Sequence, residues 1–432
     1  MKKVLFITTF FYPQNRVPTL RVGQWSKYLA RNGYKVFVLT TRKYSFMGPL
    51  GLEENLPENV KVVEVDFLPN FLKKRLEKKE NTDVKKKSNI SDSVYNIKLL
   101  IRRLRNYVGS LFDIHDLWIK PAFKIAKNIV ENEGINFIIS SYSPPATAVI
   151  AHKLKSLYHN VKWIADFRDL WAYNHISHAR IFGIYERYKE RRVLSNVDII
   201  ITVSDPLTEE MKKHYPDKRV YTIENGFDPD EFPNWENNII IKPKVKDKLV
   251  ISYLGTIYPE KRDPSILFEA CNELIEEGMI RKYQIEINFY GDNKKQLENI
   301  IRPKNYNRFN IIKINGFVPR KESLDIQRKS DLLLFLEWND PSAKGVLTGK
   351  LFEYLVSGKP ILAVGITNQN VAGKIIEKTK TGKLFVDKDA LKQELINIFT
   401  ERLIDFYDPD IKEIKKYSRD KQVLKLIDIM ES

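Results

Sequence analysis

The stretch Lys248-Leu249-Val250-Ile251-Ser252-Tyr253-Leu254-Gly255 decides how the 432-residue chain is organised. It is a nearly continuous apolar run that ends at a glycine, which is typical of a parallel strand buried on both faces. The chain begins with a similar run, Val4-Leu5-Phe6-Ile7, followed by a loop and a helical pattern. The strand–helix pattern therefore starts twice. We predict two α/β domains, each a doubly wound parallel sheet with helices on both faces.

Further strands are predicted on either side of these two runs, with helical patterns between them. The first helix is expected to end near Asn32, with Val22, Trp25 and Leu29 on its buried face and Gly33 as its C-terminal stop. The expected strands are 4–7, 35–39, 137–139, 162–165 and 197–202 in the first half, and 248–255, 285–291, 311–316, 331–336 and 360–364 in the second.

The same patterns predict the domain boundaries. Residues 1–233 form the first domain, and the polar, lysine-containing stretch 234–248 suits a linker. Residues 249–408 form the second domain, and a final helix within 409–432 is expected to pack back towards the first. Ligands of open α/β sheets bind beyond the carboxyl ends of the strands, so we expect a cleft between two facing sheets.

The composition is that of an ordinary globular protein, with 43% apolar and 29% charged residues. It excludes a disordered chain, a collagen-like repeat and a disulfide scaffold. The single cysteine, Cys271, lies among apolar residues at helical spacing and is interpreted as a small core residue. One thiol fits a reducing cytosol, and no apolar run approaches the length of a bilayer span. We expect a cytoplasmic protein.

The net charge of +17 favours a polyanionic partner. Residues 71–108 carry twelve basic and four acidic side chains, and thus eight of these net charges. We interpret residues from about 68 to 110 as a basic amphipathic insert. It suits a helix on the anionic inner face of the cytoplasmic membrane, or a surface helix packed on its own core. The flanking cations expected to contact the membrane are Lys98, Arg102, Arg103 and Arg105. A nucleic-acid partner is not expected, because the charge sits in one insert and no known motif occurs.

Two segments that follow strands carry the chemistry. The sequence has no metal-ligand spacing among its six histidines, no nucleophile elbow, no P-loop and no dinucleotide fingerprint. After Gly255-Thr256 come Lys261 and Arg262, and a diphosphate needs such close backbone approach and cations. The Gly/Thr loop of 345–349 opens a helix that carries Lys350 and, one turn later, Glu353. A carboxylate there can hold both hydroxyls of a ribose.

Four of the segments carry a family resemblance: Lys350–Leu362, Asn225–Asp228, Tyr253–Lys261 and Asn315–Pro319. Together they resemble the retaining glycosyltransferases of family 4, and the resemblance extends over nearly the whole chain. It implies the GT-B fold, two facing Rossmann-like domains with a cleft between them. Arg21, Ser140–Pro145 and Asp166–Trp171 resemble most closely the bacterial surface-polysaccharide enzymes of that family.

The resemblance implies a nucleotide-sugar donor, UDP-linked, and a saccharide acceptor linked to a polyprenyl diphosphate, with neither cofactor nor metal. The expected donor-binding residues are Gly255, Thr256, Arg262, Phe317, Val318, Thr348, Gly349 and Glu353. The residues expected to bind the acceptor are Tyr12, Arg16 and Arg21, and those expected to act in catalysis are Asp166, Arg168, Asp169, Lys261 and Lys350. The two aspartates serve equally well as parts of a structural Asp–Arg–Asp lock.

The chain departs from the family pattern at three positions. Gly345 stands where the family has a second Glu, Thr256 where Arg is frequent, and Asp166 where His is common. Arg262 or Lys350 is expected to supply the missing positive charge. Two alternatives stay open: a nucleotide-sugar epimerase of the same fold, or a degenerate membrane-associated transferase that acts as a binding protein. The sequence leaves the sugar, the acceptor and the oligomeric state open.

Overall fold

The computed structural model describes residues 1–44, 50–52, 56–70, 73, 113–174, 182–241, 243–245, 247–258, 261–338 and 345–432. They form two compact units: Met1–Ile223 with Val423–Ser432 (unit 1), and Glu224–Gln422 (unit 2). Lys98, Arg102, Arg103 and Arg105, the expected membrane contacts, lie outside the described residues. No helix in the described ranges has both the length and the apolar composition that crossing a bilayer demands.

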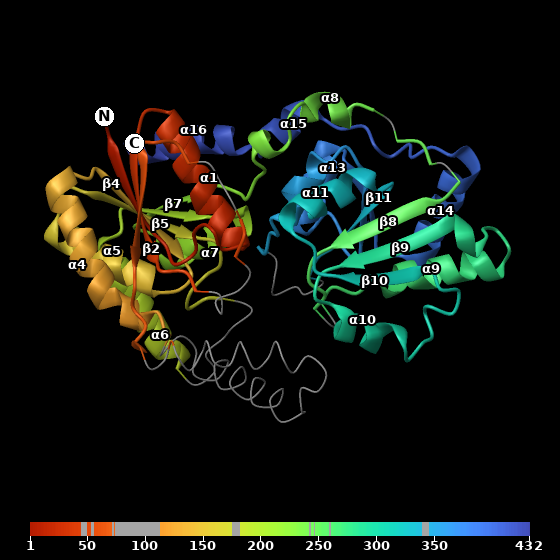
Figure 1. Cartoon of the computed structure of the whole chain (residues 1–432), viewed down its shortest axis with the longest axis horizontal. Helices are drawn as coiled ribbons and strands as arrows, with labels where there is room; N and C mark the ends of the chain where they lie inside the picture. The colour runs from red at the N-terminus through yellow and green to blue at the C-terminus, as the bar shows by residue number, and fades with distance from the viewer. Residues whose placement is uncertain are drawn as a thin grey trace. The chain divides into compact units, whose positions relative to one another are not determined.

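Unit 1 is built on a seven-stranded parallel sheet of order β3-β2-β1-β4-β5-β6-β7 (Figure 1). The strand order reverses between β1 and β4, which is the topological switch point of this sheet. The strands are β1 (Lys3–Ile7), β2 (Lys35–Thr41), β3 (Val60–Val65), β4 (Phe137–Tyr142), β5 (Lys162–Phe167), β6 (Ile199–Thr202) and β7 (Arg219–Thr222).

Helices cover both faces of this sheet, and Figure 1 shows α4 and α5 on one side and α1 on the other. The residues of β1 alternate accordingly: Val4 and Phe6 pack in the core with α1 and α16, while Leu5 and Ile7 pack in the opposite core with α4 and α5. The predicted inner face of the first helix is confirmed, and Gly33 ends that helix with φ +83°. The helices are α1 (Val17–Arg31), α4 (Asp116–Glu133), α5 (Ala146–Leu157), α6 (Gly183–Val193), α7 (Asp205–His214) and α16 (Arg419–Glu431).

Unit 2 is built on a six-stranded parallel sheet of order β10-β9-β8-β11-β12-β13. Its order reverses between β8 and β11, so the crevice at the carboxyl ends of these two strands is its topological switch point. The strands are β8 (Leu249–Leu254), β9 (Ile285–Tyr290), β10 (Ile312–Gly316), β11 (Leu332–Leu336), β12 (Ile361–Val364) and β13 (Gly382–Phe385).

The central strand β11 shows why both faces of this sheet are covered. Leu332, Leu334 and Leu336 pack in a core with α9 and α14, and Leu333 and Phe335 pack in the opposite core with α12 and α13. The helices are α8 (Trp235–Ile239), α9 (Ser265–Glu276), α10 (Lys294–Ile301), α11 (Arg320–Lys329), α12 (Lys350–Leu355), α13 (Val371–Thr379), α14 (Lys388–Glu401) and α15 (Ile411–Lys415).

The core position predicted for the single cysteine is confirmed. Cys271 lies in α9 and is fully buried, and burial raises the pKa of its thiol to about 12. Such a thiol stays protonated at neutral pH and is a poor nucleophile.

The ten predicted strands are present, and the structure adds β3, β7 and β13. All three lie at sheet edges, where partial exposure replaces the continuous apolar run with mixed residues. The stretch 234–248, expected as a linker, contains α8, and its Val245 packs in a core of unit 2. The helix expected within 409–432 is observed as two, α15 and α16, and residues 423–432 belong to unit 1.

The last helix predicts a clear stability difference within one turn. Leu426 of α16 is fully buried in unit 1, whereas Leu424 is 43% exposed. We expect Leu426→Ala to lower the free energy of unfolding by about 2–5 kcal/mol because it leaves a cavity. Leu424→Ala should change it by less than about 0.5 kcal/mol. Urea denaturation of the two variants checks this, and equal losses would contradict the packing of α16 on unit 1.

Candidate functional site

A buried ion pair lies at the switch point of unit 2. Glu337 directly follows β11, its side chain is 3% exposed, and its Oε1 lies 3.3 Å from Nη2 of Arg262. Burial raises the pKa of Glu337, and the charge of Arg262 opposes this rise. Nη1 of Arg262 also donates to the Thr256 carbonyl at 3.3 Å. A cation, Arg262, therefore lies beside Thr256.

The loops at the ends of β8 and β9 approach each other closely. The side-chain amide of Asn293 binds the Gly255 carbonyl and accepts the Ile257 N–H at 2.8 Å. Gly291 has φ +135°, and a Cβ there would lie 2.4 Å from the Gly255 oxygen. Lys261 extends from the same region, with its Nζ 4.9 Å from the centroid of the Trp338 ring. Two of the predicted cations, Lys261 and Arg262, thus lie next to residues that directly follow β11.

Glu353 of α12 is the centre of a second charged network. Its carboxylate accepts hydrogen bonds from Nη1 of Arg320 at 2.8 Å and from Nε2 of Gln327 at 3.1 Å, and Nζ of Lys350 lies 3.7 Å away. Arg320 also binds Glu231 through two bonds of 2.7 Å. Burial alone would raise the pKa of Glu353, but Lys350 and Arg320 outweigh it and lower the pKa to about 2. The carboxylate is therefore ionised at neutral pH.

Backbone contacts bring the two networks together. The Tyr354 hydroxyl of α12 accepts the N–H of Leu254, the last residue of β8, at 3.2 Å. The Thr348 N–H points towards the Glu337 carboxylate and helps to lower its pKa. Thr348 and Gly349 precede α12, a helix of six residues that begins at Lys350. Contacts thus link α12 to the end of β8, and the loop before α12 to Glu337.

The residues predicted beside the base lie at the end of β10. Phe317 is 60% exposed, and Val318 is partly exposed. They directly precede Pro319 and Arg320, so the exposed ring belongs to the segment that also supplies a partner of Glu353. Pro259 and Glu260, part of the motif after β8, lie outside the described residues.

In unit 1 the predicted Arg21 and Asp166 form a fully buried pair. Nη2 and Nε of Arg21 donate to Oδ1 of Asp166 at 2.8 and 3.1 Å, and both side chains are 0% exposed. Ser141 also donates to Asp166 at 3.0 Å, and Nη2 of Arg21 donates to the Ile223 carbonyl at 2.9 Å. The guanidinium stacks over the Trp25 ring at 4.1 Å. This pair ties α1 to β5, and neither charge reaches the surface.

The other predicted acceptor residues lie near the start of α1 and differ in environment. Arg16 is exposed and directly precedes the helix. The ring of Tyr12 packs on the helix so closely that a Cβ at Gly23 would lie 2.2 Å from its Cε2. Of the three predicted acceptor residues, Arg16 alone is exposed and Arg21 is buried.

The loop after β5 presents the remaining predicted residues, Arg168 and Asp169. Asp169 is exposed and Arg168 is partly buried. Burial lowers the pKa of the Arg168 guanidinium, which the charges of Asp166 and Asp169 oppose. The buried Nε of Arg168 has no hydrogen-bond partner among the described residues.

Glu190 of α6 anchors the far end of this loop. Its carboxylate accepts the Ala172 N–H and, at 2.6 Å, the Tyr215 hydroxyl. The side chain is fully buried, no arginine or lysine among the described residues bonds to it, and burial raises its pKa to about 7.

Glu337, Arg320, Gln327 and Glu190 are among the residues of these networks that sequence reasoning missed. A usable signal existed for two of them. Glu337 is an acid directly after an apolar strand, and Arg320 directly follows the recognised Asn315–Pro319 turn. Gln327 and Glu190 lie inside helical patterns, where nothing in the sequence marks them.

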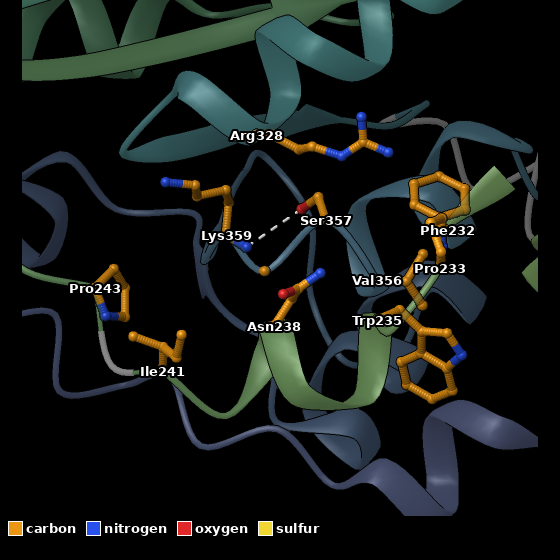
Figure 2. A pocket seen from close by; sticks show the side chains of 11 residues that line it. Phe232, Pro233, Trp235, Asn238, Ile241, Pro243, Arg328, Val356, Ser357 and Lys359 are labelled. Carbon is orange, nitrogen blue, oxygen red and sulfur yellow. Dashed lines mark hydrogen bonds between the residues drawn. The ribbon is translucent and has the colours of Figure 1, made fainter.

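A pocket of about 530 Å³ in unit 2 is separate from all these residues (Figure 2). Its lining includes Trp235, Asn238, Ile241, Arg328 and Lys359, but none of the predicted donor residues. Lys359 precedes β12, so the pocket lies towards the amino end of that strand, opposite to the usual ligand edge of such sheets. Within the described ranges, no three His, Cys, Asp or Glu side chains gather in a metal-binding arrangement.

Because the Arg21–Asp166 pair is fully buried, we expect a single substitution in it to destabilise the protein strongly. Asp166→Asn leaves the Arg21 charge buried without its counter-charge, so we expect a loss of about 3–5 kcal/mol in the free energy of unfolding. The matched variant Asp169→Asn changes an exposed carboxylate in the same loop and should cost under about 0.5 kcal/mol. Urea denaturation distinguishes them, and a mild effect of Asp166→Asn would show that the pair is not a structural lock.

Glu190 predicts a pH dependence of stability. Its pKa is raised from 4.5 to about 7 in the folded state, so between these values the folded chain binds more protons than the unfolded one. The free energy of unfolding should therefore fall as pH rises through this window, by on the order of 3 kcal/mol. Glu190→Gln should remove this part of the slope, measured by denaturation at about pH 5 and about pH 8. If stability depends on pH equally in the native protein and in Glu190→Gln, the pKa of Glu190 is not raised.

Comparison with known proteins identifies a family domain. Residues 89–231, about a third of the chain, match the family model Glyco_transf_4, described as Glycosyltransferase Family 4. No curated protein sequence resembles the chain at a significant level.

Solved structures share the fold over the whole chain. Sucrose-phosphate synthase from Thermosynechococcus elongatus has a TM-score of 0.64 at 12% identity, covering 100% of this chain and 98% of that one. A trehalose-6-phosphate structure from E. coli, bound with UDP-2-fluoro glucose, has a TM-score of 0.63 at 12% identity and covers 100% and 99%. WaaG, a glycosyltransferase involved in lipopolysaccharide biosynthesis, has a TM-score of 0.55 at 12% identity and covers 99% of both chains.

At these identities the likeness shows the fold alone, and it confirms the predicted GT-B architecture. The sequence match adds a likeness to the Glycosyltransferase Family 4 model over residues 89–231. Residues 89–231 are thus similar to the Glycosyltransferase Family 4 model, and the chain as a whole has a GT-B fold.

Proposed function

We propose that this protein transfers a sugar from a UDP-linked donor to a saccharide carried on a polyprenyl diphosphate, with retention at the anomeric carbon, in bacterial surface-polysaccharide synthesis. The family 4 match supports the reaction class. The fold shared with WaaG, which is involved in lipopolysaccharide biosynthesis, is consistent with such a pathway. Unit 2 is assigned the donor and unit 1 the acceptor.

The observation that carries the proposal is the ionised and oriented carboxylate of Glu353. A carboxylate has about four acceptor sites on its two oxygens. Arg320 occupies one site on Oε1 and Gln327 one on Oε2, so both oxygens retain acceptor capacity. Two neighbouring hydroxyls, as on a ribose, match that geometry. The exposed Phe317 ring, in the segment leading to Arg320, provides a surface for the base.

The donor diphosphate is assigned to the cations and backbone around the switch point. Lys261, Arg262 and Lys350 supply positive charge, and the Gly255–Thr256 turn and the N–H groups of Thr348 and Gly349 supply close backbone approach. When the sugar–phosphate bond breaks, negative charge develops on the diphosphate, and preorganised cations stabilise it. In the retaining route that the family resemblance implies, the acceptor hydroxyl attacks on the face the phosphate leaves and gives its proton to that phosphate.

The acceptor is assigned to the exposed polar residues of unit 1. Asp169 lies in the loop after β5 and is exposed, whereas Asp166 is buried against Arg21. Asp169 is thus the aspartate available to an acceptor hydroxyl. Asp166, paired with Arg21, holds the start of the loop that carries Asp169. Arg16 and Arg168 offer positive charge for an anionic carrier.

Glu353→Gln should weaken binding of UDP by on the order of 10- to 100-fold, because it removes charged hydrogen bonds to the ribose. Glu231→Gln is the matched control: it also changes a partner of Arg320 but keeps the carboxylate of Glu353. It should leave the affinity within about threefold, a loss smaller than that of one hydrogen bond. Isothermal titration calorimetry measures both.

A deoxynucleotide completes the test. If Glu353 holds the ribose, 2′-deoxy-UDP binds the native protein more weakly than UDP, but the two bind Glu353→Gln alike. Equal losses from Glu231→Gln and Glu353→Gln would show that the effect runs through Arg320 instead. Product analysis with and without an acceptor then separates transfer from epimerisation and from binding alone.

A further inference from the structure

Helix α6 in unit 1 has the reverse of the usual amphipathic pattern. Glu186 and Glu190 face the interior, at 4% and 0% exposure. Ile184, Tyr185 and Tyr188 face outward, at 78%, 50% and 61%. A surface helix of a globular protein normally buries its apolar side chains and exposes its charged ones. Core packing therefore does not account for the outer face.

The inward glutamates have an explanation within the fold. Glu190 holds the loop after β5 through the Ala172 N–H, and it accepts the Tyr215 hydroxyl of the segment after α7. The neighbouring Lys189 lies 5.9 Å from the Trp171 ring of the same loop. The inner face of α6 thus holds the loop after β5 in place, whereas the role of the outer face has to be sought outside the core.

The charge of the outer face indicates what that partner is. Arg187, Arg191 and Arg192 are exposed, and none of them forms an ion pair with a described residue. The helix exposes no carboxylate, since both of its glutamates are buried. The face therefore combines an aliphatic side chain, two tyrosines and three arginines, and it attracts negative charge without offering any to a basic group.

We propose that the outer face of α6 docks on an anionic lipid bilayer. Tyrosines favour the membrane–water interface, and an exposed isoleucine can enter the boundary of the acyl chains. Arginines are drawn to anionic headgroups. A lipid surface matches this face better than a folded protein does. An anionic bilayer presents negative charge only, whereas a protein surface also carries basic side chains, for which this face has no carboxylate. The three arginines of this face are not part of the basic insert predicted at about residues 68–110.

This inference goes beyond the transfer reaction and gives the proposed lipid-linked acceptor a location. Because α6 holds the Asp166–Ala172 segment through Glu190, docking of α6 would keep that segment at the lipid surface. A lipid-linked saccharide is confined to the same surface. The docking itself needs no donor and can be measured without catalysis.

Sedimentation with vesicles tests the proposal on the full chain. The probe is an equal mixture of phosphatidylglycerol and phosphatidylcholine, compared with pure phosphatidylcholine. Arg187→Gln/Arg191→Gln/Arg192→Gln should lower the partition coefficient on the order of 100-fold, about fivefold per charge. The charge-matched control Arg302→Gln/Lys321→Gln/Lys329→Gln changes exposed cations of unit 2 and should lower it less than about fivefold. Ile184→Ser/Tyr188→Ser should weaken binding also in high salt, where screening has removed the electrostatic part.

Several outcomes would overturn the proposal. If the α6 variants bind the anionic vesicles as well as the native protein does, α6 makes no contact with them. If the α6 and control variants lose equal binding, the contact is not specific to α6. Equal binding to neutral vesicles would exclude recognition of anionic lipid. Retained sedimentation together with protection of the α6 tyrosines by residues 74–112 would show that the chain itself covers this face. UDP binding, measured in parallel, should stay unchanged in every α6 variant, so a failure here is distinguishable from a failure of the proposed function.

Discussion

Burial of a parallel sheet on both faces is the constraint on which the rest of this structure depends. In β1 and β11 successive side chains enter opposite apolar cores, which leaves no room for polar groups along the strands. Two carboxylates of the candidate site lie at strand ends, and both are shielded from water there. Asp166 at the end of β5 and Glu337 after β11 are both met by an arginine. The edge where ligands of such sheets bind is thus built from buried ion pairs.

The partner of a buried carboxylate decides its charge. Glu353 and Glu190 are both buried, yet the pKa of Glu353 is about 2 and that of Glu190 about 7. Burial raises both, but Lys350 and Arg320 reverse the effect at Glu353, while a tyrosine hydroxyl and a backbone N–H bind Glu190. Replacing buried ion pairs by apolar groups often costs little stability. At Glu353 the neighbouring cations keep the buried carboxylate ionised at neutral pH.

The sequence predicted those parts of the fold that are recorded locally. Continuous apolar runs indicated the central strands, whereas the mixed residues of β3, β7 and β13 at the edges carried too weak a pattern. For the site, spacing and the family resemblance indicated Lys350, Glu353 and Arg262. Their partners were not predictable in the same way: 75 residues separate Arg262 from Glu337, and Arg320 precedes Glu353 by 33. Only the fold brings such pairs together.

The loop after β5 shows how these elements combine in unit 1. Arg21 of α1 fixes its start at Asp166, and Glu190 of α6 fixes its end at Ala172. Between these two anchors lie Arg168 and the exposed Asp169. The first anchor is an ion pair, whereas the carboxylate of the second, Glu190, loses its negative charge when the pH falls below about 7. A carboxylic acid still accepts hydrogen bonds, but more weakly than a carboxylate. Protonation weakens these two hydrogen bonds, but it removes the larger cost of a buried charge, so acidification stabilises the α6 end of the loop.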